Sequence, residues 1–132
     1  LPVVSPAPHD HHSLLQLYLD GPKDKLFYIF SLNLSKKIKI KNNVFGKPFE
    51  FVKNKELSKI ISSQKKALTK VFRKKNIPYR EFKINEINEK VLGELFSYFV
   101  LETALIGKFI GINPFDQPAV EEVKILTKQY LS

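Results

Sequence analysis

The stretch DKLFYIFSL, residues 24–32, is a nearly continuous apolar run with the length of one strand. Strands of parallel sheets, which helices cover on both sides, have this pattern, so we expect this strand to be buried on both faces. Residues 79–84, YREFKI, alternate polar and apolar side chains and predict a second, short strand. Helices are predicted between and outside these strands, so the sequence indicates a layered α-β-α fold of the α/β class with a partly parallel sheet.

Capping residues and helix-breaking residues mark the ends of the first two predicted helices. Asp10 is a candidate N-cap for a helix that ends at Gly21. Asn54 is the candidate N-cap for a long basic helix that stops at Asn76, before a proline. The apolar side chains of this basic helix, with one glutamine, recur at helical spacing and predict its inner face: Leu57, Ile60, Ile61, Gln64, Leu68, Val71 and Phe72.

The C-terminal third predicts two further helices. A long helix over residues 86–110 contains the most hydrophobic run of the chain. Charged side chains and two glycines interrupt that run, so we expect a helix buried in a core or a subunit interface rather than a membrane span. A terminal helix then extends to residue 130. Residues 35–53 alternate Lys with apolar residues, which suggests a solvent-facing strand or an ordered loop. We expect no internal domain boundary in residues 1–132.

The chain has 132 residues, without Met and without Cys. Lacking Met, it cannot start at its own initiator, so we expect it to be a piece of a longer chain. The absence of Cys excludes disulfides, thiolate metal sites and thiol nucleophiles. The first residues, LPVVSPAPHDHH, lack the basic region and apolar core of a secretory signal, so we expect a cytoplasmic protein.

The formal net charge of +9 raises the question of nucleic-acid binding. Residues 36–75 hold 14 of the 22 basic residues and 2 of the 13 acidic ones. Lys outnumbers Arg 20 to 2, whereas recognition of bases and phosphates favours Arg. We therefore favour a solvated basic helix face, which can still attract anionic sugar phosphates. Nucleic-acid binding through this helix is the alternative, and the lysines that would carry it are Lys65, Lys66, Lys70 and Lys74.

Residues 107–124, GKFIGINPFDQPAVEEVK, join an apolar run to the terminal helix through a turn. Asp116 is a candidate N-cap, and Pro118 fits the first helical turn. Gln117, Glu121 and Lys124 have the spacing i, i+4, i+7 and share one helix face. A carboxamide and an ammonium there suit an oxygen-rich, anionic or polyhydroxylated ligand, and an ordinary amphipathic surface helix gives the same spacing.

This stretch resembles the C-terminal signature of the glucose-6-phosphate isomerase family. In that signature an aromatic–Asp–Gln is followed by Gly-Val-Glu and a closing Lys. Ala119 stands at the usual glycine position and departs from the pattern by one methyl group. The matching residues are Phe115, Asp116, Gln117, Val120, Glu121 and Lys124.

A second stretch, HDHHSLLQLYLDGPKDK at residues 9–25, resembles the family segment in which Gln-His opens a helix and is followed by Gln-Leu. Alignment on Gln16-Leu17 places His12 at the catalytic histidine position and His11 where the family commonly has Gln. The sequence LDGPKDK within this stretch also resembles bacterial members of the family. A metal site built from these histidines is disfavoured, because adjacent residues on a helix point in different directions.

The resemblance implies the fold, the activity and the roles of three residues. The fold would be the C-terminal part of a second sugar-isomerase domain, which is flavodoxin-like. The activity would be the interconversion of glucose 6-phosphate and fructose 6-phosphate in glycolysis and gluconeogenesis, without a cofactor. His12 and Lys124 would be the catalytic ring-opening pair, and Gln117 would bind the substrate. The family is dimeric, so His12 would complete the site of a partner subunit.

The resemblance also implies that part of the site lies upstream of this chain. Family members use a carboxylate base, a Ser/Thr-rich phosphate loop and an Arg that precede the histidine motif. We therefore expect the 132 residues alone to have no isomerase activity. The alternative is a non-catalytic sugar-phosphate-binding module of the same fold, which a phosphate loop without the carboxylate base would indicate.

Overall fold

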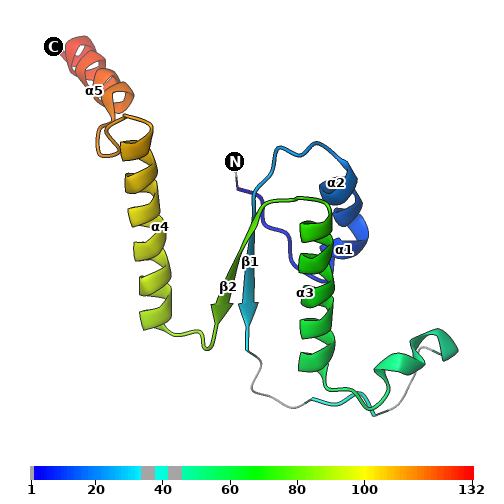
Figure 1. Cartoon of the computed structure of the whole chain (residues 1–132). Coiled ribbons are helices and arrows are strands. Elements are labelled where there is room, and N and C mark those ends of the chain that lie inside the picture. The colour runs from blue at the N-terminus through cyan, green and yellow to red at the C-terminus, as the bar shows by residue number, and fades with distance from the viewer. Residues whose placement is uncertain (1, 34–37, 42–45) are drawn as a thin grey trace. The chain divides into compact units, whose positions relative to one another are not determined.

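The computed structural model describes residues 2–33, 38–41 and 46–132, and the chain divides into two compact units (Figure 1). The first unit, Leu1–Glu86, contains α1 (Asp10–Ser13), α2 (Leu15–Asp20), β1 (Phe27–Leu32), a 3-10 helix η1 (Lys47–Val52), α3 (Leu57–Lys74) and β2 (Tyr79–Ile84). The second unit, Ile87–Ser132, contains α4 (Glu89–Phe109) and α5 (Pro118–Leu131). Our expectation of one domain without an internal boundary stays a prediction.

The first unit is built on a parallel crossover. β1 pairs with β2 in parallel, in a register that runs from Phe27 opposite Tyr79 to Leu32 opposite Ile84. Parallel neighbours need a crossover connection, which α3 provides alongside the two strands (Figure 1). The predicted α/β class is confirmed, and β2 has the bounds that the sequence predicted.

The core of this unit is aromatic. Phe72 on α3 is 2% exposed and packs against the first residue of each strand, with its ring centroid 4.8 Å from that of Phe27 and 5.8 Å from that of Tyr79. Tyr18 on α2 meets Phe27 edge-on, with the centroids 5.2 Å apart. Ile77 follows α3 and is 6% exposed. Helices α2 and α3 are thus joined to the first residues of both strands.

The prediction that the first strand is buried on both faces is wrong for the described chain. Along β1, half-buried and exposed side chains alternate. Tyr28 and Phe30 are 37% and 47% exposed, and both rings stack on Phe82 of β2. The contacts with α2 and α3 come from the opposite face of the sheet, and cross-strand packing stabilises the aromatic face.

A polar layer follows the aromatic core along α3. The Lys65 Nζ donates to Glu81 Oε1 at 2.6 Å and to Ser31 Oγ at 3.1 Å. The side chains of Lys65 and Glu81 are only 24% and 23% exposed. The hydrogen bond from Lys65 lowers the pKa of Glu81, against the opposing effect of desolvation. Lys65 therefore ties the crossover helix to both strands and is not part of a solvated basic face.

Two of the predicted helix caps are wrong. His9, not Asp10, precedes α1. Asp10 is the first residue of the helix, and its carboxylate accepts from the His9 ring at 2.9 Å. Glu56, not Asn54, precedes α3. Asn54 has φ of 58° and forms part of a turn.

The segment before α3 is partly described. An antiparallel bridge pairs Glu56 with Lys39, and η1 lies between these two residues in sequence. The prediction for residues 35–53 was a solvent-facing strand or an ordered loop. A bridge and a 3-10 helix replace the strand in the described part, while residues 34–37 and 42–45 lie outside the described residues.

Helix α4 of the second unit is capped at both ends. The Asn88 side chain accepts from the Val91 backbone N–H at 2.9 Å at the N-terminus. At the C-terminus Gly111 has φ of 77°, its N–H donates to the Lys108 carbonyl, and the Ile112 N–H donates to the Gly107 carbonyl at 3.0 Å. These are the two bonds of a Schellman motif, which needs a residue that tolerates positive φ.

The burial of the long helix in a core or a subunit interface stays a prediction. Along α4, which is described throughout, Gly107 is the single buried residue. Phe96 and Phe109 are 67% and 87% exposed. An apolar helix of this kind is stable only when it packs against other surfaces, so burial requires partners beyond the neighbours that α4 has here. Within the described residues no helix combines the length and the apolar composition that a membrane span requires.

The Lys65–Glu81 bond predicts an acid-dependent loss of stability. A carboxylate whose folded pKa is lowered stabilises the fold above its unfolded pKa of about 4.3, and this stabilisation is lost as the pH falls through the folded pKa. We expect Glu81→Gln to lower the free energy of unfolding at pH 7 and to flatten its decline below about pH 5, measured by urea denaturation. Glu50→Gln is the control, since the exposed pair of Glu50 with Lys53 contributes little. Equal flattening in both variants contradicts the prediction.

Candidate functional site

The three predicted site residues lie in different units. His12 is on α1 of the first unit, whereas Gln117 and Lys124 are at the start of α5 and on α5 in the second unit. Gln117 and Lys124 are therefore held by one helix, as the sequence predicted. Their pairing with His12 stays a prediction.

His12 is exposed on a single helical turn. Its backbone N–H donates to the His9 carbonyl at 3.3 Å, so the backbone is fixed while the imidazole remains accessible. The neighbouring pair of His9 and Asp10 lowers the pKa of Asp10, first through their hydrogen bond. In the described part of the chain, no three His, Asp or Glu side chains come together as a metal site would require.

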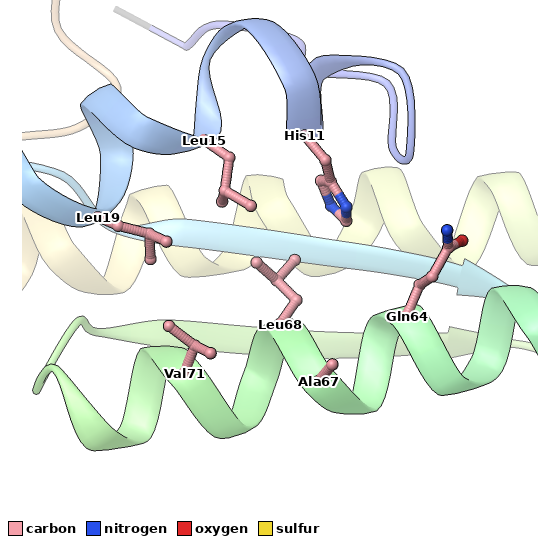
Figure 2. A pocket seen from close by; sticks show the side chains of 7 residues that line it. All are labelled: His11, Leu15, Leu19, Gln64, Ala67, Leu68 and Val71. Atoms are coloured by element: carbon pink, nitrogen blue, oxygen red, sulfur yellow. The ribbon is translucent and has the colours of Figure 1, made fainter. Parts of the chain in front are cut away.

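His11 rather than His12 faces the interior. It lines a pocket with a volume of about 210 Å³ between α1, α2 and α3 (Figure 2). The other lining residues are mostly aliphatic: Leu15, Leu19, Gln64, Ala67, Leu68 and Val71. The His11 Nε2 is buried and has no hydrogen-bond partner among the described residues. Packing on α3 therefore fixes this helical turn through His11, and it leaves the ring of the next residue, His12, outside.

The start of α5 differs from the prediction by one residue. Gln117 precedes the helix in place of Asp116, and Pro118 occupies the first turn as predicted. The Gln117 carbonyl accepts from the backbone N–H of Val120 at 3.0 Å and of Glu121 at 3.2 Å. These bonds fix the backbone of Gln117 and leave its exposed carboxamide available to a ligand.

Glu121 forms an ion pair with Lys124. The Lys124 Nζ lies 2.5 Å from the Glu121 Oε1, and the two side chains are 61% and 60% exposed. An exposed pair contributes little to stability. Its main effect is to direct the ammonium along the α5 face that begins at Gln117.

The turn between α4 and α5 is closely packed. A Cβ on Gly107 would lie 2.8 Å from the Pro114 Cβ, closer than van der Waals contact permits. The Asn113 Oδ1 accepts from the Phe115 backbone N–H at 3.1 Å and closes the turn. The glycine, asparagine and proline of residues 107–124 thus set the path of the chain into Gln117.

The side chains of His12, Gln117 and Lys124 can bind an oxygen-rich ligand and move protons. An exposed imidazole donates or accepts a proton near neutral pH. A lysine ammonium stabilises a negatively charged oxygen, and a carboxamide both donates and accepts hydrogen bonds.

The sequence prediction missed the polar layer at Lys65 and the pocket at His11. The only sequence signal for either was the polar Gln64 within the inner face of the basic helix, with Lys65 next to it.

The fold is similar to that of a known crystal structure. A hypothetical protein from Thermus thermophilus superposes with a TM-score of 0.73 at 24% identity, over 96% of this chain and 31% of that one. At this identity the likeness shows the fold alone, and it confirms the class of layered α/β proteins. No family model matches the chain.

Sequence relatives define the family more narrowly. A probable glucose-6-phosphate isomerase of Methanococcus maripaludis is 33% identical over 99% of this chain and 29% of its own length. The glucose-6-phosphate isomerases of Methanocaldococcus jannaschii and Campylobacter jejuni are 35% and 29% identical over 93% and 99% of this chain, and over 30% and 32% of their own lengths. The chain is thus homologous to a segment of glucose-6-phosphate isomerase, and it spans about a third of the length of these relatives. The resemblance inferred from the two ends of the sequence is confirmed.

The packing of Gly107 on Pro114 predicts that even one methyl group is not tolerated there. We expect Gly107→Ala to lower the free energy of unfolding by about 1–3 kcal/mol, because the rigid proline ring must move. Gly93→Ala is the matched control within α4. Nothing lies within 4 Å of its added Cβ, so we expect this variant to gain about 0.5–1 kcal/mol from helix propensity. Urea denaturation followed by circular dichroism measures both, and equal stability of the two variants refutes the packing argument.

Proposed function

We propose that this chain is the C-terminal portion of a cytoplasmic glucose-6-phosphate isomerase and supplies the ring-opening half of its active site. The observation that carries the proposal is the similarity of nearly the whole chain to enzymes of that name. The accessible side chains of His12, Gln117 and Lys124 support it, because each has the chemistry that its proposed role requires.

Ring opening of a sugar phosphate needs one proton accepted and one donated. A base removes the proton of the anomeric hydroxyl while an acid protonates the ring oxygen, so the bond between the anomeric carbon and the ring oxygen breaks and a carbonyl forms. His12 suits one of these transfers, and Lys124 assists it or stabilises the negative oxygen. Gln117 binds sugar hydroxyls. Glu121 orients Lys124 through the 2.5 Å bond.

Proton transfer between C2 and C1 of the open sugar needs a base that we assign to a part of the protein outside these 132 residues. The chain alone is therefore inactive. A sugar-phosphate-binding module without catalysis remains the second candidate. Nucleic-acid binding through the basic helix is less well supported, since Lys65, one of the four lysines that would carry it, is hydrogen-bonded to Glu81 and Ser31.

Lys124 provides the first functional test. In the intact parent protein we expect Lys124→Ala to lower kcat for fructose 6-phosphate by about 10²–10⁴-fold with a much smaller change in KM, because the residue acts in the transition state. Lys128→Ala, one turn further along α5, is the control and should keep the parental kcat. A kcat that is unchanged in Lys124→Ala excludes the catalytic role of Lys124. Turnover by the 132 residues alone excludes the assignment of the base to a part of the protein outside them.

A mixed dimer tests the shared site. If His12 serves the partner subunit, a dimer of one His12→Gln and one Lys124→Ala subunit has one complete site and one site that lacks both groups. Random assembly makes half of the dimers mixed, so we expect about one quarter of the parental activity from two inactive variants. An activity assay on the co-expressed dimers, without separating the mixed ones, measures this. A mixture as inactive as its components shows that the residues of each site come from one subunit.

A further inference from the structure

The inner face of α3 changes in character along its length. Near its C-terminus Phe72 packs on the first residues of both strands. Two turns earlier Lys65 bonds Glu81 and Ser31. Its N-terminal end lies next to the last residues of the strands (Figure 1), and there α3 presents Ser58, Lys59 and Ser62 beside the apolar Ile61. Carboxyl ends of parallel strands are where α/β folds bind ligands, so this end has the position of a binding site.

A pocket with a volume of about 520 Å³ lies at this end. β1 contributes Ser31, β2 contributes Lys83, and α3 contributes Lys65. The remaining polar lining of α3 consists of Ser58, Lys59 and Ser62. Three cations and three hydroxyl groups from three elements thus surround one space. In the first unit this grouping brings together residues that are far apart in the sequence.

The hydrogen bonds of these residues leave binding capacity for an anion. The ammonium groups of Lys59 and Lys83 make no hydrogen bond or ion pair with the residues that the structure describes. Lys65 uses two of its three N–H donors on Ser31 and Glu81. Glu81 is the one acidic partner of these lysines in the described chain, so the three ammonium groups exceed the local negative charge by two. Of the three hydroxyl groups, those of Ser31 and Ser62 already donate to the carbonyls of Phe82 at 3.4 Å and Lys59 at 3.0 Å. Ser58 has no hydrogen-bond partner among the described residues, so its O–H donor is free.

We propose that this pocket, formed by Ser31, Ser58, Lys59, Ser62, Lys65 and Lys83, binds a phosphate group, either as the free ion or as a monoester. A phosphate dianion matches the excess charge of two, and its oxygens can accept from the ammonium groups of the three lysines and from the Ser58 hydroxyl. The Lys65–Glu81 bond positions one donor and keeps it pointed into the pocket. The inference does not depend on the isomerase activity proposed above.

A nucleic-acid backbone fits this arrangement less well. Binding to a polymer needs cations in a stripe along the path of the chain. Lys70 and Lys74 continue along α3 but lie outside the pocket, with Lys70 about 16 Å from Lys59 along the helix axis. A pocket on which lysines of both α3 and β2 converge favours a small anion.

The test is a titration of the 132-residue chain with inorganic phosphate, followed by the amide resonances of Ser58, Ser62 and Lys83. We expect saturable shifts that sodium chloride at equal ionic strength does not produce. The double variant Lys59→Gln/Lys83→Gln should bind at least about tenfold more weakly, because it loses two charge-assisted bonds. Its matched control is Lys70→Gln/Lys74→Gln, which removes the same charge from the same unit and should bind as the parent does.

Each outcome decides the proposal. Equal weakening in the two double variants, or shifts that do not saturate, shows a general response to charge and overturns it. Unchanged binding in Lys59→Gln/Lys83→Gln overturns it as well, provided that thermal unfolding shows both variants to be folded. Glycerol phosphate identifies the source of the phosphate group: shifts at the same amides support a monoester ligand, and their absence beside binding of inorganic phosphate supports the free ion. Retained binding in Lys124→Ala separates the pocket from the residues of α5.

Discussion

The packing of Phe72 against Phe27 and Tyr79 is the interaction on which the first unit depends. One ring on α3 holds the two ends of the crossover together, since its centroid lies 4.8 Å and 5.8 Å from theirs. Removing a buried phenylalanine costs about 3–5 kcal/mol, a large share of the stability of a small domain. The strand register, the Lys65–Glu81 bond and the packing of α2 through Tyr18 all require α3 to stay at this distance. The polar pocket at the other end of α3 exists because the same ring fixes the helix axis along the strands.

Local patterns predicted the elements better than their surroundings. The alternation of residues 79–84 and the helical spacing from Leu57 to Phe72 depend on neighbouring residues alone, and both were predicted correctly. The burial of β1 on both faces was predicted wrongly and that of α4 stays a prediction, since apolar composition shows that a surface needs a partner but not that the chain contains it. The caps failed for a related reason. Asp10 could have capped the helix, but its carboxylate accepts from His9 instead.

The candidate site was predictable as a set of residues and not as a geometry. Motif resemblance indicated His12, Gln117 and Lys124, and two of them lie together at the start of α5. The structure adds the reason that the intervening residues matter. The Schellman motif at Gly111 ends α4, and the contact of Gly107 with Pro114 fixes the turn that follows. This contact spans the end of a helix and the turn after it, so no helical or strand periodicity relates the two residues, and it could not be inferred from spacing.

The basic helix shows why net charge alone is a poor guide to function. Lys65, Lys66 and Lys70 look equivalent in sequence, yet Lys65 lies against the sheet and holds a carboxylate, whereas the other two are exposed. A half-buried cation with a single carboxylate partner keeps an unused donor, and that donor is stronger in a half-buried site than in water. Lys59 and Lys83 add charge at the same place without adding a counter-charge. The excess positive charge therefore matters for function in the few lysines that converge on the pocket, and not in the many that are spread over the outer face.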